Sequence, residues 1–300
     1  MEPQLTEVLR FFDLGKPTDY RRAGGFANEN YFVTSDKGEF VVKILREHAA
    51  SNVYSELPYL KKISEHHFPS VTYMSNSSGV CVYESEDMAA VVMRKVEGGP
   101  PERSHSTNAT MGSVLAKLHT IPSEDLEPRS SYLGEGFMEG AISELEQSVP
   151  SEDIQPYVEA MSRLDTFKRS LPDKASRIIH CDFTPNNCLF KNDSLIAVID
   201  WEEVTLGYPL LDLANAILST CFTDTRFDKT MSDALLNAYF DENDWGELDL
   251  SDLAQAIRFA GLTFSLWVYR RWGIDSAEPF IVSNRQLYWR YDLDRVESHL

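Results

Sequence analysis

The chain has 300 residues, of which 43% are hydrophobic and 25% charged, and its formal net charge is −19. This is the composition of an ordinary globular protein, which excludes a disordered or fibrous chain. The surplus of acids disfavours nucleic acid and anionic membrane surfaces as partners, because both are bound through clustered Lys and Arg.

Targeting and redox patterns favour a cytoplasmic protein. The first residues lack a basic segment followed by an apolar core, and no apolar run has the length of a membrane span. The four cysteines show no CxxC spacing, which favours reduced thiols over disulfides or a zinc site. We therefore expect a cytoplasmic location.

The first third of the chain alternates as strands do. Residues 30–34 and 39–45 are rich in β-branched and aromatic side chains, and residues 35–38 between them have turn chemistry, which predicts a β-hairpin. Residues 80–83 and 89–93 predict a second strand pair.

Helical periodicity dominates after residue 107. Gly and Pro in residues 97–101 interrupt both patterns, so this segment predicts the connector between an N-terminal domain, 1–96, and a C-terminal domain, 97–300. Residues 108–119 predict the first helix of the second domain. Its apolar face comprises Met111, Val114, Leu115 and Leu118.

Residues 177–201 contain the densest pattern of polar side chains at strand ends. Apolar runs at 177–179 and 195–199 are each followed by an acidic residue at the start of a loop. An acceptor hydroxyl can be oriented by one carboxylate, while an amide and a second carboxylate hold a divalent metal at the phosphates of a nucleotide. Taken singly, each acid could equally cap a helix.

The spacing of His180, Asp182 and Asn187, followed by Asp200 after a strand, resembles the HxDxxxxN and metal-binding segments of the protein-kinase-like fold. The likeness is greatest to the aminoglycoside phosphotransferase, choline kinase and homoserine kinase family. It implies an α+β, bilobal fold, with an N-terminal antiparallel sheet lobe carrying one helix and a larger, mainly helical C-terminal lobe. It also implies ATP and Mg²⁺ as cofactors.

The same resemblance implies roles for the four residues. Asp182 would be the catalytic base, and Asn187 and Asp200 the metal ligands. His180 would belong to the catalytic group by holding the shape of the loop rather than by transferring a proton. Asp212, in a segment that resembles the start of a family helix, would support this loop, although a helix cap would look the same.

Residues 24–33 resemble the nucleotide-binding turn of the family, which implies phosphate contacts at Gly24, Gly25 and Asn28. Met93 and Lys95 lie at the end of the last strand, where the fold offers backbone hydrogen bonds to adenine. A plain hairpin and a plain strand end would show the same residues.

Lys43 lies inside an apolar strand, where an unpaired ammonium is costly to bury. The family places a lysine here that touches the α- and β-phosphates. Glu56 is its expected partner, with Glu47 and Glu65 as alternatives. Pro58 suits the first turn of a helix, so we expect Glu56 near a helix start.

The resemblance also implies a small-molecule acceptor with a hydroxyl group. Residues 258–272 and 56–60 are similar to the Arg-ended helix and the acidic-Leu-Pro-aromatic segment of homoserine kinases, and an arginine there would hold a carboxylate. Alternatively, Trp201, Glu202 and Glu203 would line a site for a polyamine antibiotic. Homoserine ranks first, an aminoglycoside second, and other sugars or choline behind them.

A catalytically silent binding protein is the alternative from another class. The presence of every expected functional side chain argues against it. Oligomeric state, ATP or GTP preference and the reacting hydroxyl are left open. The enzyme interpretation predicts that four side chains converge around a metal-bound triphosphate: Lys43, Asp182, Asn187 and Asp200.

Overall fold

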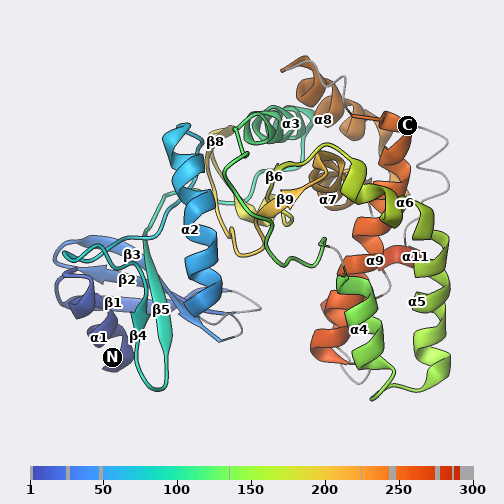
Figure 1. The fold of residues 1–300 in the computed structure, drawn as a ribbon. Helices are drawn as coiled ribbons and strands as arrows, with labels where there is room; N and C mark the ends of the chain where they lie inside the picture. The colour runs from blue at the N-terminus through green and yellow to red at the C-terminus, as the bar shows by residue number, and fades with distance from the viewer. Residues whose placement is uncertain are drawn as a thin grey trace. The chain divides into compact units, whose positions relative to one another are not determined.

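The computed structural model describes residues 3–24, 28–46, 50–134, 136–223, 225–242, 248–273, 278–285 and 287–290. The chain divides into two compact units (Figure 1). Unit 1 comprises residues 1–99 and 196–202, and unit 2 comprises residues 100–195 and 203–300. The segment 196–202 therefore belongs to the N-terminal unit, although a single boundary after residue 96 would assign it to the C-terminal one.

Unit 1 is built on a five-stranded sheet with the order β1-β2-β3-β5-β4. β2 (Glu29–Ser35) and β3 (Gly38–Leu45) form the predicted hairpin, with Ser35 opposite Gly38. Gly38 has a φ of 130°, a left-handed value that glycine adopts without steric cost. The other strands are β1 (Pro17–Arg22), β4 (Tyr83–Glu84) and β5 (Ala89–Arg94).

The second predicted strand pair is shorter than expected. Of residues 80–83 only Tyr83 is in a strand, where it pairs with Ala90. Val80 is excluded because its backbone N–H donates to the side chain of Asn76 and its carbonyl accepts from the Asn76 N–H. These groups close a turn and are no longer available to a strand neighbour.

Two helices pack on opposite faces of the sheet. α1 (Pro3–Phe11), which the sequence analysis did not predict, shares one core with Tyr31, Phe40 and Val92. α2 (Ala50–Glu65) contributes Val53 to the other core, beside Leu45. Side chains two residues apart in a strand point to the same face, so Lys43 lies on the α2 face with Leu45.

Glu56 lies in the interior of α2, so the expectation that it sits near a helix start is wrong. The helix continues through Pro58, which removes one helical hydrogen bond at a cost of about 3 kcal/mol. Burial of Val53, Tyr59 and Ile63 offsets this cost, since each buried apolar side chain contributes about 1.5–3 kcal/mol.

Unit 2 is mainly helical. The predicted first helix is confirmed as α3 (His105–His119), which begins at its Ser104 cap, three residues earlier than expected. α3 packs closely on α8 (Lys229–Asp241), where a Cβ on Gly112 would lie 2.1 Å from the Leu235 carbonyl oxygen. The other helices are α4 (Phe137–Leu145), α5 (Ser151–Arg163), α6 (Asp165–Ser170), α7 (Pro209–Thr220), α9 (Leu253–Trp272), α10 (Pro279–Arg285) and α11 (Leu287–Arg290).

Short strands connect these helices. The expected apolar runs form β6 (Arg177–Ile179) and β8 (Ser194–Val198). β6 pairs with β9 (Thr205–Gly207), and β8 with β7 (Cys188–Lys191). A further hairpin joins β10 (Phe222–Thr223) and β11 (Arg226–Phe227). Three 3₁₀ turns span Leu171–Asp173, Pro185–Asn187 and Leu250–Asp252.

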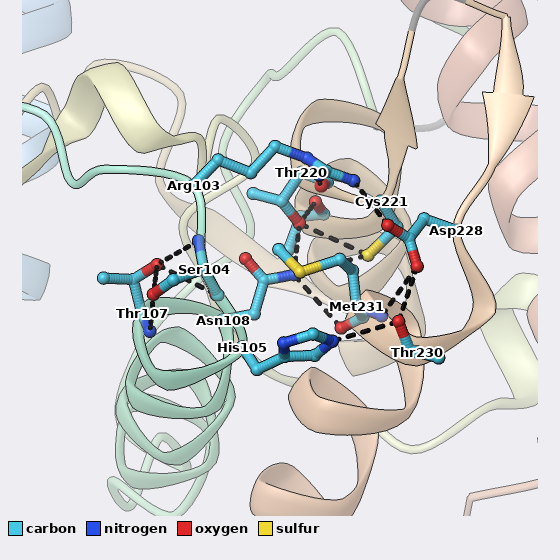
Figure 2. Close-up of polar contacts among 11 residues, drawn as sticks. Arg103, Ser104, His105, Thr107, Asn108, Thr220, Cys221, Asp228, Thr230 and Met231 are labelled. Atoms are coloured by element: carbon cyan, nitrogen blue, oxygen red, sulfur yellow. Dashed lines mark hydrogen bonds and ion pairs between the residues drawn. The ribbon is translucent and has the colours of Figure 1, made fainter.

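A buried polar cluster joins the start of α3 to the end of α7 and the start of α8 (Figure 2). The Asn108 amide donates to Thr220 Oγ1 and to the Met231 carbonyl, at 3.1 Å each. Arg103 donates to the Thr220 carbonyl at 3.1 Å and to Asp228 at 3.0 Å. The Arg103 side chain thus satisfies a backbone carbonyl at the C-terminal end of α7.

Across the described ranges, no helix combines the length and apolar character that crossing a membrane requires.

Candidate active site

The Lys43 ammonium is buried in unit 1 and held by two carboxylates. Its side chain is 8% exposed, and Nζ lies 2.8 Å from Asp200 Oδ1 and also contacts Glu202 Oε1. Burial acts to lower the pKa of Lys43, but the charges of Asp200 and Glu202 outweigh it and raise that pKa above its ordinary value. Lys43 is therefore a permanent cation.

Asp200 follows β8 in a conformation that is uncommon for a residue with a Cβ. Its φ is 67°, in the left-handed region, where a side chain costs roughly 1–2 kcal/mol. Its side chain is 43% exposed although it pairs with the buried Lys43. Such local strain is typical of functional sites.

Asn28 connects the predicted nucleotide-binding turn to Glu202 within unit 1. Its amide nitrogen donates to Glu202 Oε1 at 2.6 Å, and its carbonyl oxygen accepts the Arg46 backbone N–H at 2.9 Å. The Gly24 carbonyl accepts from the Asn30 side chain at 3.1 Å. Gly25 lies outside the described residues, and the phosphate contacts of Gly24 and Asn28 stay a prediction.

The carboxylates on Lys43 differ from those that the sequence analysis considered. Glu56 accepts a hydrogen bond from the Tyr73 hydroxyl at 2.7 Å, and burial together with the charge of Glu56 raises the pKa of Tyr73 well above its usual value. Glu65 ends α2 and pairs with Lys61 at 3.8 Å. Glu47 lies outside the described residues. Pairing of Glu56 with Lys43 stays a prediction, whereas Glu202 was missed as a partner.

Asp182 and Asn187 are directly hydrogen-bonded in unit 2. The Asn187 amide nitrogen donates to Asp182 Oδ2 at 2.7 Å and to the Asp182 carbonyl at 2.9 Å. The 3₁₀ turn Pro185–Asn187 brings the two side chains together across five residues. The amide nitrogen therefore faces Asp182, and the amide oxygen is the atom of Asn187 that suits a metal.

Asp212 holds the loop in which Asp182 lies. Fully buried in the first turn of α7, it accepts the backbone N–H groups of His180 at 2.6 Å and Cys181 at 2.7 Å. Cys181 has a left-handed φ of 67°, which this pair of hydrogen bonds stabilises. The buried His119 ring lies between Asp212, at 3.2 Å, and the Tyr239 hydroxyl, at 2.8 Å, and so connects α3 to this carboxylate.

His180 is completely buried, and its Nδ1 accepts the Asp182 backbone N–H at 3.2 Å. This contact fits the expected role in shaping the loop, which stays a prediction.

The residues expected near adenine lie at the end of β5. The Lys95 backbone N–H donates to the Glu39 carbonyl, and the Lys95 ammonium pairs with the Glu39 carboxylate at 2.9 Å. Met93 pairs with Val41 inside the sheet. Adenine contacts of Met93 and Lys95 also stay a prediction.

The three residues considered for a polyamine site each have protein contacts, and that site stays a prediction. Trp201 is buried against Phe68, with ring centroids 5.8 Å apart, because the side chain after Asp200 turns into the core of unit 1. Glu202 is engaged by Lys43, and Glu203 accepts the Tyr132 backbone N–H at 3.1 Å.

The arginines that end α9 have protein partners. Arg270 binds both oxygens of Glu144, at 2.5 and 2.9 Å. The Arg271 guanidinium lies 4.8 Å from the centre of the Trp272 ring, and burial lowers its pKa. Binding of a substrate carboxylate by Arg270 would require the loss of the Glu144 pair, which weakens that expectation.

The residues expected to bind Mg²⁺ offer suitable atoms. Asn187 supplies an amide oxygen and Asp200 an exposed carboxylate, and Mg²⁺ prefers a few oxygen ligands completed by water and phosphate. Among the described residues no group of three or more His, Cys, Asp or Glu forms a metal cluster. An amide oxygen and a carboxylate suit Mg²⁺ by their chemistry, and binding of Mg²⁺ by Asn187 and Asp200 stays a prediction.

Comparisons with known proteins agree with the sequence resemblance. The family described as "Phosphotransferase enzyme family" matches residues 20–250. Homoserine kinase of Methylobacillus flagellatus is 27% identical over 244 residues, which cover 79% of this chain and 74% of that protein. Homoserine kinase of Pseudomonas aeruginosa PAO1 is 25% identical over 282 residues, covering 92% and 87%.

Solved structures share the fold. An amicoumacin kinase in complex with AMP-PNP and Ca²⁺ superposes with a TM-score of 0.77 at 13% identity, covering 99% of this chain and 97% of that one. A choline kinase from Streptococcus pneumoniae gives 0.75 at 17% identity, covering 100% and 99%. The protein-kinase-like fold class is confirmed, with its N-terminal antiparallel sheet and mainly helical remainder.

Proposed function

We propose that this chain, which belongs to the phosphotransferase enzyme family, transfers the γ-phosphate of ATP to the hydroxyl group of an amino alcohol such as homoserine. Its class, a phosphotransferase with a hydroxyl acceptor, follows from the family. The amino-alcohol acceptor is supported by relatives named homoserine kinase, of which this chain covers 74–87% in the two cases above.

One observation carries the proposal: the Asn187 amide is bonded to the Asp182 carboxylate at 2.7 Å, in a loop fixed by the buried Asp212. The pair holds one Asp182 oxygen in place, which positions the carboxylate to accept a proton from an acceptor hydroxyl. A structural aspartate would not require a strained residue, Cys181, next to it.

In this proposal each residue has one role. Asp182 orients the hydroxyl and takes its proton, and Lys43 binds the α- and β-phosphates as a permanent cation. Asn187 and Asp200 would hold Mg²⁺, which would neutralise charge on the phosphates. Gly24, before β2, would leave room for phosphate oxygens, because a Cβ there would meet no atom within 4 Å.

The test compares Asp182→Asn with Asp193→Asn, which changes an exposed aspartate in the turn between β7 and β8. We expect Asp182→Asn to lower kcat by about 10²–10⁴-fold, the usual contribution of a general base, while the Kd for the ATP analogue AMP-PNP stays within threefold. Asp193→Asn should leave both unchanged. A kcat within threefold of the original enzyme for Asp182→Asn would remove the base from the proposal.

The acceptor is tested by ATP consumption with a panel of hydroxyl compounds. Turnover of homoserine without turnover of kanamycin, spectinomycin or choline supports an amino-acid acceptor. Turnover of an aminoglycoside instead would assign the chain to antibiotic modification, as the structural likeness to a spectinomycin phosphotransferase allows. Nucleotide binding without turnover of any compound would support a silent binding protein.

A further inference from the structure

Glu202 has no role in the proposed function, yet it contacts both Lys43 and Asn28. Its side chain is 10% exposed, and its Oε1 atom faces the Lys43 ammonium and accepts from Asn28 at 2.6 Å. Asn28 is buried, so the carboxylate is held from two sides. We infer that Glu202, clamped by Asn28, is a positioning residue that keeps the Lys43 ammonium in place when Asp200 binds metal.

The need for such a residue follows from the two tasks of Asp200. In the structure Asp200 and Glu202 together neutralise Lys43. If the proposed function holds, on which this inference rests, Asp200 turns toward Mg²⁺ in the nucleotide complex. A buried cation that loses its partner is strongly destabilised, and the phosphates replace Asp200 only once they reach Lys43, so a second carboxylate holds the ammonium in place for them. Glu202 is that carboxylate.

The local backbone explains why Glu202 rather than Trp201 faces Lys43. Trp201, between the two acids, is buried against Phe68, while Asp200 Oδ1 and Glu202 Oε1 both contact the Lys43 ammonium. The segment is not a strand, and the left-handed φ of Asp200, 67°, turns the chain at this point. No contact with a helix of unit 1 is required for this arrangement.

Asn28 links the same carboxylate to the backbone of two strands. Its oxygen accepts the Arg46 N–H at 2.9 Å, just after β3, and its own position is just before β2. The chain Arg46–Asn28–Glu202–Lys43 thus ties the predicted nucleotide-binding turn to the lysine. A displaced Glu202 would disturb both.

The experiment measures binding of the fluorescent nucleotide mant-ADP with saturating Mg²⁺, so its readout does not depend on turnover. Glu202→Gln keeps the shape and removes the charge. The matched control is Glu84→Gln, because Glu84 is also a carboxylate of unit 1 with a side-chain partner, the Tyr54 hydroxyl at 2.9 Å, and lies outside the predicted nucleotide-binding turn. We expect about a tenfold higher Kd for Glu202→Gln and a Kd within twofold for Glu84→Gln, with kcat falling only in the former.

A Lys43→Met background separates positioning from metal binding. If Glu202 acts through Lys43, adding Glu202→Gln to Lys43→Met changes the Kd less than twofold, because the residue to be positioned is gone. A tenfold loss that persists in this background would make Glu202 a metal ligand and overturn the inference. A Glu202→Gln variant that binds mant-ADP as Glu84→Gln does would also overturn it.

Folding and the proposed function are controlled separately. Circular dichroism checks the fold, and if Glu202→Gln does not fold, Asn28→Ala replaces it, since it removes the clamp and keeps every charge. We expect about a threefold higher Kd for Asn28→Ala and no further effect beside Lys43→Met; an unchanged Kd would overturn the inference. Absence of nucleotide binding by the unsubstituted protein would overturn the proposed function as well.

Discussion

Replacing Asp212 with Asn should loosen the loop that carries Asp182. The Asp212 carboxylate accepts the N–H groups of His180 and Cys181 with separate oxygens, at 2.6 and 2.7 Å. Asn can keep one of these hydrogen bonds, but its NH₂ group meets the other N–H as donor against donor. One buried backbone N–H is then left without an acceptor.

The size of the effect follows from these contacts. A hydrogen bond to a charged group contributes about 1.5–3 kcal/mol, and an unsatisfied buried donor costs a similar amount. We therefore expect the free energy of unfolding to fall by about 3 kcal/mol, which corresponds to roughly 6–12 °C in Tm for a unit of this size. Release of the left-handed Cys181 returns about 1 kcal/mol at most.

We expect Asp212→Asn to have a larger effect on kcat than on the free energy of unfolding. A displacement of about 1 Å at a catalytic group can cost about a hundredfold in rate, so kcat of Asp212→Asn should fall by about that factor. The Kd for AMP-PNP should stay within threefold. Urea unfolding followed by circular dichroism and steady-state kinetics measure the two effects, with Asp233→Asn, an exposed position in α8, as control. A stability loss below about 1 kcal/mol together with a kcat within twofold would refute the reasoning.

Three further predictions concern unit 2. Gly112→Ala should destabilise the protein by about 1–3 kcal/mol in urea unfolding, because the new Cβ would lie 2.1 Å from the Leu235 carbonyl oxygen. The control Gly140→Ala has open space around the new Cβ and should be neutral or stabilising by up to about 1 kcal/mol. Asn108→Ala should cost about 2 kcal/mol by removing two buried hydrogen bonds, to Thr220 Oγ1 and to the Met231 carbonyl, while the half-buried Thr110→Ala stays within about 0.5 kcal/mol. Burial raises the pKa of the Cys221 thiol to about 12 and that of the Cys188 thiol higher. Iodoacetamide at pH 8, followed by mass spectrometry, should therefore label both cysteines only in urea. Labelling of either cysteine in the native protein would contradict this burial.

The sequence was informative where the signal is local. The hairpin of β2 and β3 follows from alternation and turn residues, and α3 follows from its apolar face. α1 was missed, although three residues of this short helix, Leu5, Val8 and Leu9, complete the core beneath the sheet. A nine-residue helix has little periodicity to read, and its stability comes from packing against strands far along the chain.

The partner of Lys43 could not be chosen from a helix pattern, because the contact joins residues 157 positions apart. A local signal was present nonetheless. Two acids, Asp200 and Glu202, flank the apolar Trp201 directly after the apolar run of β8. Combined with a lysine inside an apolar strand, that pattern predicts a buried cation with two carboxylates, since one carboxylate that also serves a metal cannot serve the lysine at all times.

This requirement also explains why residues 196–202 belong to unit 1. Lys43 lies on the α2 face of β3, between apolar neighbours, and its ammonium cannot be buried there without anionic partners. The segment that follows β8 brings those partners, and Trp201 secures it by packing into the core beside Phe68. A change that removes the Trp201 side chain should therefore act on Lys43 without touching it: the segment would lose its hold, and the lysine would lose Asp200 and Glu202 together.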